Sequence, residues 1–123
     1  MIYCGISAFG ANGPKREDTG YDNALQAYSG IMAMTGHGDG RPLKSGAQVV
    51  DYATGLSAAF AISAALYQRE RTGRGQFIDL SLLDCGLASL SHFAMNYLVS
   101  GEVPQRRGNG GYGGIPSQAF PCK

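Results

Sequence analysis

The sequence contains little charge and almost no excess of either sign. Lysine and arginine total 10 and aspartate and glutamate total 9, so the formal net charge is +1. A nearly neutral chain lacks the basic surface that attracts nucleic acid or anionic membranes. Charged residues make up only 15% of the chain and hydrophobic residues 44%, a balance typical of folded proteins rather than disordered ones. We therefore expect a globular protein that binds neither nucleic acid nor a membrane.

Cysteine is also scarce, and no long uninterrupted apolar run is present. Cys4, Cys85 and Cys122 form no C-x-x-C pair, and no histidine stands at metal-ligand spacing from them. This pattern indicates neither a disulfide framework nor a metal site, and it favours a reducing cytoplasm. The N-terminus lacks the basic and then apolar segments of a secretory signal. The most apolar stretch, residues 52–67, is interrupted by polar residues and is predicted to be too short to span a bilayer.

Several common catalytic and cofactor motifs are missing. The glycines at 36, 38 and 40 and those from 108 to 114 do not form the G-x-G-x-x-G of a dinucleotide site. No G-x-S-x-G elbow occurs, so a serine hydrolase is disfavoured. His92 stands alone in a helical pattern, where a structural role is commoner than a catalytic one. Cys85 is expected to be an inert packing residue, because the neighbouring Asp84 opposes thiolate formation.

The patterns that are present predict a mixed α/β fold in one modest domain of 123 residues. Alternation with period two predicts strands over residues 2–9 and 76–82. Apolar residues at helical spacing predict helices over residues 22–34, 51–71 and 83–99. Asp22 is the expected N-cap of the first helix.

Asp51 is the leading candidate for chemistry, because it stands at the start of a long alanine-rich helical pattern. Aspartate is a favoured helix N-cap, so a purely capping role is one interpretation. A carboxylate at a helix N-terminus is also stabilised in its ionised form by the helix dipole, and an ionised carboxylate can act as a nucleophile. The two roles are compatible, and the local sequence leaves both open.

The glycine-dense run between Arg106 and Pro116 is the second candidate. Such a composition is most often a flexible loop, although its backbone amides can also form a cradle for an anion. Amides freed by glycine can stabilise a developing oxyanion. Together with a carboxylate upstream, this run favours acyl transfer over simple ligand binding.

Several motifs in order carry a resemblance to a known family. They are residues 2–10 (IYCGISAFG) with Gly13-Pro14, residues 20–22 (GYD) with 26–30 (QAYSG), residues 51–55 (DYATG), residues 71–76 (RTGRGQ) and residues 78–84 (IDLSLLD). In this combination and spacing, the chain closely resembles the class III CoA-transferases, the group that includes formyl-CoA transferase and carnitine CoA-transferase. The resemblance covers essentially the whole chain.

The resemblance implies an enzyme that moves CoA from an acyl-CoA thioester to a free carboxylic acid. Asp51 matches the aspartate that, in this family, carries the acyl group as a mixed anhydride and then CoA as a thioester. The loop Gly110, Gly111, Tyr112, Gly113 and Gly114 resembles the mobile loop that shields this intermediate from water in formyl-CoA transferase. Tyr112 departs from the all-glycine form of that loop, so formyl or oxalyl specificity is not implied.

The resemblance also implies an assembly and a set of partners. Residues 1–123 are expected to form the middle third of the family's chain, a Rossmann-like part of the large α/β domain. Complete members form interlocked homodimers, and a piece of this length is expected to lack full activity. The partners are an acyl-CoA and a carboxylic acid. Coenzyme A takes part as a substrate moiety, and no permanently bound cofactor or metal is expected.

Two alternatives remain open at this stage. The α-methylacyl-CoA racemases belong to the same superfamily and use a histidine where this chain has Tyr21. Tyrosine, with a reference pKa of about 10, is a poor base at neutral pH, which favours the transferase. The second alternative is an inactive piece that acts only as a binding module through exposed apolar surface.

Overall fold

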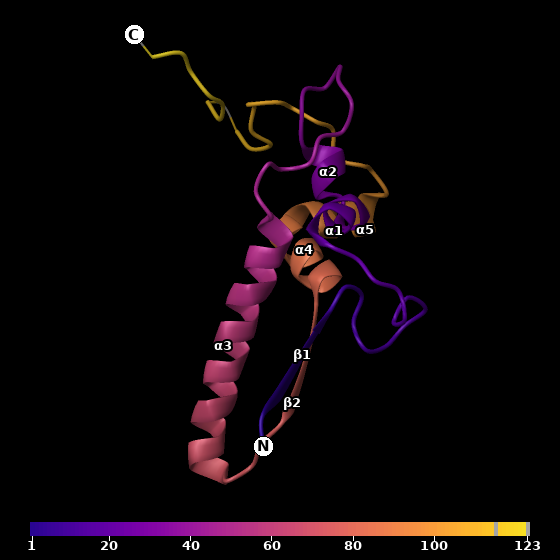
Figure 1. The fold of residues 1–123 in the computed structure, drawn as a ribbon. Coiled ribbons are helices and arrows are strands. Elements are labelled where there is room, and N and C mark those ends of the chain that lie inside the picture. Colours follow the sequence, from indigo (N-terminus) through magenta and orange to yellow (C-terminus); the bar gives the residue numbers. More distant parts are fainter. Residues whose placement is uncertain (115, 123) are drawn as a thin grey trace.

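The computed structural model describes residues 1–114 and 116–122. Strand β1 (Tyr3–Ser7) is followed by helices α1 (Asp22–Ser29), α2 (Ile31–Met34) and α3 (Val49–Thr72), and these lead to strand β2 (Phe77–Ser81) and helices α4 (Leu82–Leu90) and α5 (His92–Ser100). Figure 1 shows the long α3 beside the two strands, with the shorter helices gathered at one end of α3. The mixed α/β fold confirms the fold class predicted from the sequence.

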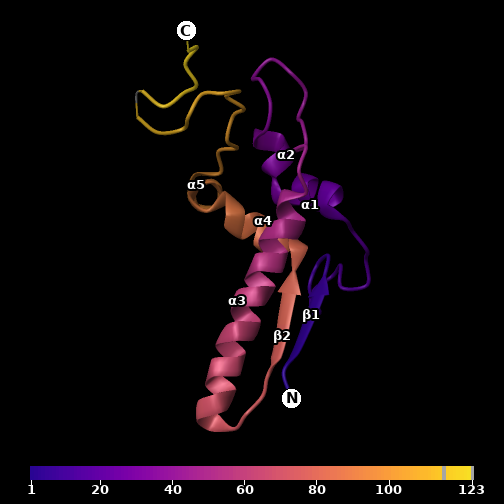
Figure 2. The same cartoon turned by 60° about the vertical axis from the view of Figure 1, so that its left-hand side comes forward.

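The two strands pair in parallel, with Tyr3 opposite Phe77 and Ser7 opposite Ser81. Parallel strands need a long crossover connection, which α3 supplies by running back along the strands, as Figure 2 shows from a second side. The rings of Tyr3 and Phe77 stack with their centroids 5.5 Å apart. Each observed strand is shorter than the predicted one, because the chain leaves the sheet at Ser7 and enters α4 at Leu82.

Helix α3 begins at Val49, two residues before its predicted start. It ends at Gly73, which takes a left-handed conformation with φ 70° and donates its N–H to the Arg69 carbonyl. The buried face consists of Val50, Thr54, Ala58 and Ala65. The larger apolar side chains of the predicted helical stripe face outward instead: Leu56, Phe60 and Tyr67 are 72%, 78% and 61% exposed.

The other two predicted helices are each divided in two. The helix predicted over residues 22–34 breaks at Gly30, whose φ of 93° is readily adopted only by glycine. Tyr21 rather than Asp22 is its N-cap residue. The helix predicted over residues 83–99 breaks at Ser91, which has a φ of 52°. Local periodicity continues through both breaks, so it does not reveal them.

The hydrophobic core lies where the end of β1, helix α1 and the first turn of α3 meet. Its fully buried members are Ala8, Leu25 and Val50, and Phe9, Ile31, Leu82 and Leu83 pack against them. Figures 1 and 2 both place α1 beside the first turn of α3. Asp51 directly follows Val50, so the candidate carboxylate stands next to a residue of the hydrophobic core.

The apolar stretch of residues 52–67 was predicted to be too short to span a bilayer. This prediction is wrong, because the stretch belongs to a longer helix. That stretch lies within the 24 residues of α3, which is long and apolar enough by length and composition alone to cross a membrane. One such helix is weak evidence of a membrane span, because helices of soluble proteins meet the same criterion. Only 22% of the relevant window is buried, so the outer face of α3 has little cover among the described residues.

Candidate functional site

Asp51 occupies the third position of α3, and its side chain is exposed. It lines an open depression of about 280 Å³ together with Tyr52, Gly55 and Leu56. Gly55 lies one helical turn beyond Asp51, and a methyl group added there would meet no described atom within 4 Å. The carboxylate therefore faces a space that can admit part of another molecule.

The interpretation of Asp51 as the N-cap of this helix is wrong. Gln48 is the N-cap residue by position, and its side chain makes no capping hydrogen bond. The cap comes from Asp22, whose Oδ1 accepts hydrogen bonds from the backbone N–H of Val50 at 2.8 Å and of Asp51 at 3.3 Å. Asp22 is only 2% exposed and lies 28 residues before Val50 in the chain. Asp22, which was predicted to be the N-cap of the first helix, therefore caps α3 instead.

Gln26 holds Asp22 in place from the next turn of α1. Its amide nitrogen donates to Asp22 Oδ2 at 2.5 Å and to the Ala47 carbonyl at 3.3 Å. Its amide oxygen accepts from the backbone N–H of Ser45 at 2.8 Å. Gln26 is fully buried, and together with Asp22 it joins α1, the segment before α3 and the start of α3 in one hydrogen-bonded network.

The sequence analysis missed the roles of Asp22 and Gln26. Their spacing of four residues on a predicted helix is a usable signal, because it places the two side chains on the same face. Nothing in the local sequence indicates that their partners are Val50 and Asp51. By contrast, the Asp51 carboxylate itself makes no hydrogen bond or ion pair with any described residue.

The glycine loop is not brought against Asp51 by any contact among the described residues. Gly110 pairs with Gln118 in an isolated antiparallel bridge. The Tyr112 hydroxyl donates to the Gln105 carbonyl, and the Tyr112 ring packs edge-on against Phe93 of α5 with centroids 4.6 Å apart. Figures 1 and 2 show this C-terminal segment extending outward at the end of the molecule where α3 begins. Loop and carboxylate thus share one end of the molecule without touching.

Arg106 ties the segment before the glycine loop to the α2 region. Its guanidinium donates to the carbonyls of Ala33, His37 and Gly40, at 3.2, 3.3 and 2.8 Å. Since its donors are directed at backbone oxygens, Arg106 anchors the chain here and is not available as an anion ligand in this arrangement.

Three residues that the sequence analysis did not assign to the site, His92, Cys85 and Tyr21, differ in their exposure. His92 is exposed at the start of α5, and its ring lies 3.9 Å from that of Phe93. Cys85 is buried in α4, whereas Tyr21 is 85% exposed. Across residues 1–114 and 116–122, no group of three or more histidine, cysteine, aspartate or glutamate residues is arranged to hold a metal ion.

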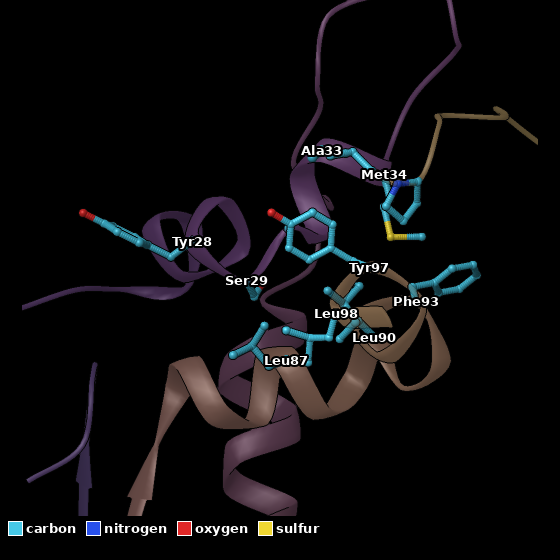
Figure 3. A pocket seen from close by; sticks show the side chains of 13 residues that line it. Tyr28, Ser29, Ala33, Met34, Leu87, Leu90, Phe93, Tyr97 and Leu98 are labelled. Atoms are coloured by element: carbon cyan, nitrogen blue, oxygen red, sulfur yellow. The ribbon is translucent and has the colours of Figure 1, made fainter. Parts of the chain in front are cut away.

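A larger cavity of about 480 Å³ lies between α1 and α2 on one side and α4 and α5 on the other. Figure 3 shows Leu87, Leu90, Phe93, Tyr97 and Leu98 directed into it from α4 and α5, opposite Met34 of α2. Among the residues that the structure describes, its lining includes none from α3 and no charged side chain. These residues offer no ion pair to a carboxylate or phosphate, and the cavity is separate from Asp51.

Comparison with known proteins shows which family this chain is similar to. A family model described as CoA-transferase family III matches residues 1–123. A succinate–glutarate CoA-transferase of Agrobacterium fabrum is 48% identical over 109 residues, which cover 89% of this chain and 27% of that protein. The succinyl-CoA:glutarate CoA-transferase of Homo sapiens is 43% identical over 123 residues, which cover 100% of this chain and 28% of that protein.

Solved structures agree with these matches. The crystal structure of a CAIB/BAIF family protein from Brucella suis is 47% identical and has a TM-score of 0.88, over 96% of this chain and 31% of that chain. The resemblance inferred from sequence motifs is confirmed. This chain spans less than a third of the length of each of these relatives.

Proposed function

This chain belongs to CoA-transferase family III, and on that basis we propose that its protein transfers CoA from an acyl-CoA thioester to a free carboxylic acid, with Asp51 as the covalent carrier. The observation that supports this proposal is the state of the Asp51 carboxylate. It is exposed at the start of α3, borders an open depression and forms no bond with any described residue. A carboxylate without partners keeps its lone pairs available for attack on a carbonyl carbon.

The proposed reaction proceeds in four balanced steps. The Asp51 carboxylate attacks the thioester carbonyl, and the C–S bond breaks to give a mixed anhydride and CoA thiolate. The thiolate then attacks the aspartyl carbonyl, which gives an aspartyl-CoA thioester and releases the donor acid. The acceptor carboxylate attacks this thioester and forms a second mixed anhydride and free thiolate. Finally, the thiolate attacks the acceptor acyl carbon, which yields the new acyl-CoA and regenerates Asp51.

Each step passes through a tetrahedral oxyanion, which needs hydrogen-bond donors nearby. Gly55 leaves open space beside Asp51 at which an acyl group can approach the helix. The backbone N–H groups of Val50 and Asp51 already donate to Asp22, so they are not free to bind this charge. The open space beside Gly55 supports the approach of an acyl group to Asp51.

We assign to the loop Gly110–Gly114 the shielding of the aspartyl intermediates from water. Water exclusion suppresses hydrolysis of an anhydride or thioester, and glycine absorbs the dihedral changes of a closing loop. In the structure described here, Tyr112 holds the loop against Phe93 and Gln105. The loop must therefore release these contacts before it can close over Asp51.

The names of the relatives guide the choice of substrates. The Agrobacterium and human relatives are named for succinate or succinyl-CoA and glutarate, and a Streptomyces avermitilis relative, 38% identical over 136 residues, is named a formyl-CoA:oxalate CoA-transferase. We propose a dicarboxylic acid as acceptor, with succinyl-CoA and glutarate as the first pair to test. CoA enters and leaves as a substrate moiety and is not retained as a cofactor.

The outer face of α3 supports a larger assembly, which we propose is an interlocked homodimer of a longer chain. Leu56, Phe60 and Tyr67 are mostly exposed there, and contiguous apolar surface of this kind usually marks an interface. We also place the protein in the cytoplasm and away from membranes, which the free thiols of Cys4, Cys85 and Cys122 support. The exposed apolar face of α3 fits a binding module as well as a subunit interface, whereas the unbound Asp51 carboxylate favours the transferase.

The experiment that tests the proposal is trapping of the intermediate. The complete protein that carries this sequence is incubated with succinyl-CoA, quenched with hydroxylamine and analysed by peptide mass spectrometry. We expect an aspartyl hydroxamate at position 51, absent in Asp51→Ala. Asp84→Ala is the matched control, because Asp84 is exposed at the same third position of α4. An adduct at another residue, or CoA exchange that survives Asp51→Ala, would rule out this mechanism.

A further inference from the structure

We propose that Asp22, held by Gln26, is the positioning residue for Asp51: it occupies the free amides at the start of α3, and thereby fixes the Asp51 backbone and leaves the Asp51 carboxylate unbound. This inference rests on the proposed function, since it assigns Asp22 a task in the acyl transfer at Asp51. It concerns a residue that lies on a different helix and is shielded from solvent.

Asp22 is a buried carboxylate without a cation. It is 2% exposed, and the ion pairs of the described residues, Lys15 with Asp18 and Arg16 with Glu17, lie elsewhere on the surface. A buried charge is costly unless it is hydrogen-bonded or electrostatically compensated. Here compensation comes from two backbone N–H groups at the positive end of α3 and from the Gln26 amide. The position of Asp22 and the start of α3 therefore depend on each other.

Gln26 determines which way the Asp22 carboxylate points. Its amide oxygen is taken by the Ser45 N–H, so only its nitrogen can face Asp22. That nitrogen also binds the Ala47 carbonyl, two residues before α3 begins. A rotation of the Gln26 amide would place donor against donor at Ser45 and acceptor against acceptor at Asp22. The network therefore has one arrangement that satisfies its buried polar groups.

The consequence for Asp51 is that its own side chain is free of any capping task. An acidic residue in the first turn of a helix commonly accepts hydrogen bonds from free N–H groups there. In α3 the amides of Val50 and Asp51 are already bound to Asp22. The same bonds hold the Asp51 backbone against the core, through Val50, which is 1% exposed. A nucleophile held in this way needs little reorganisation before attack.

The test measures the single-turnover rate of adduct formation at Asp51 in the complete protein, with succinyl-CoA and a hydroxylamine quench. Asp22→Asn places an amide nitrogen opposite the Gln26 nitrogen, or opposite the α3 amides, so one donor pair must clash. We expect the rate to fall about 10- to 100-fold, a range consistent with misplacement of a reacting group by about 1 Å. The affinity for succinyl-CoA, measured by equilibrium binding, is expected to change less than about threefold, because Asp22 is buried and both its oxygens are bonded within the protein.

Rescue distinguishes positioning from general damage. In the double variant Asp22→Asn with Gln26→Glu, the new amide donates to the new carboxylate, which still accepts from Ser45 but places an oxygen against the Ala47 carbonyl, so we expect partial recovery, at least about twofold over Asp22→Asn. Ser81→Ala is the matched control. Ser81 is 1% exposed and caps α4 through the Asp84 N–H at 2.9 Å, so loss of its hydroxyl lowers stability without removing a hydrogen bond of α3. We expect its rate to stay near that of the wild type.

A second variant covers the case in which Asp22→Asn does not fold. Gln26→Met keeps the volume of the side chain and removes the amide that orients Asp22, and we expect a rate about three- to tenfold below wild type. A wild-type rate in either folded variant overturns the inference. A loss of the same size in Ser81→Ala overturns it as well. If the wild type forms no adduct at position 51, the proposed function fails first, so the two failures are distinguishable.

Discussion

Gly86 of α4 provides the sharpest test of how closely the helices around the site pack. It is buried against α1, and a Cβ added there would lie 2.9 Å from Ser29 Cβ, 3.1 Å from Ser29 Oγ and 3.7 Å from Val50 Cγ2. Favourable carbon–carbon contacts lie at about 3.5–4.0 Å. In Gly86→Ala the two helices must therefore separate by roughly half an ångström or more, because Ser29 Cβ is attached directly to the α1 backbone.

Two opposing effects determine how much Gly86→Ala changes the free energy of unfolding. Alanine in a helix interior is favoured over glycine by about 0.5–1 kcal/mol. Overpacking a closely packed contact typically costs about 1–3 kcal/mol. The overpacking cost is larger than the gain in helix propensity, so we expect Gly86→Ala to be destabilised by about 0.5–2 kcal/mol. Gly55→Ala is the matched control in α3, where the new methyl meets no described atom within 4 Å, so it should be stabilised by about 0.5–1 kcal/mol.

The assay is urea unfolding of the complete protein, followed by circular dichroism, with wild type and both variants measured side by side. The two substitutions are chemically identical, so the difference between them reports only what the new methyl contacts. Adding Ser29→Ala to Gly86→Ala should not restore stability, because the shortest contact is to Ser29 Cβ, which alanine keeps. Equal stabilisation of Gly86→Ala and Gly55→Ala would refute the close approach of α1 and α4.

Two further predictions concern the site itself. Gly55→Ala, although more stable, is expected to slow adduct formation at Asp51 several-fold, because its methyl group occupies the depression beside the carboxylate; an unchanged rate in the single-turnover assay would mean that the acyl group does not use this space. Tyr112→Phe removes the hydroxyl that donates to the Gln105 carbonyl, so limited proteolysis within residues 108–114 should be faster while the melting temperature stays nearly the same; cleavage at the wild-type rate would show that this bond does not restrain the loop.

Local patterns predicted the elements better than their ends. Both strands and the long helix were found at nearly the right positions, because period-two and period-3.6 spacing depend on local geometry. The breaks at Gly30 and Ser91 were missed, since apolar spacing continues across them. The helical spacing of α3 predicted the helix but not which of its faces is covered. Its large apolar residues are exposed because the described chain supplies no partner for them.

Sequence patterns predicted only part of the candidate site. Asp51 could be singled out from its place at the start of a long helix and from the family motif around it. The assignment of its capping role was wrong, because a cap can come from any residue that the fold brings to the helix end. Whether the glycine loop reaches Asp51 depends on a movement that neither the sequence nor the described contacts of Tyr112 settle in advance, so its role stays a prediction.

The order and spacing of its motifs were enough to identify the family of this chain, its mixed α/β character and its candidate carboxylate, because these follow from residue identity and local periodicity. Only the tertiary structure decided that Asp22 and Gln26 bind the start of α3, that Asp51 is left unbound, and that Gly86 lies against Ser29. These facts are hydrogen bonds and contacts between segments distant in the chain. They exist only once packing of Leu25 and Val50 has brought α1 and α3 together.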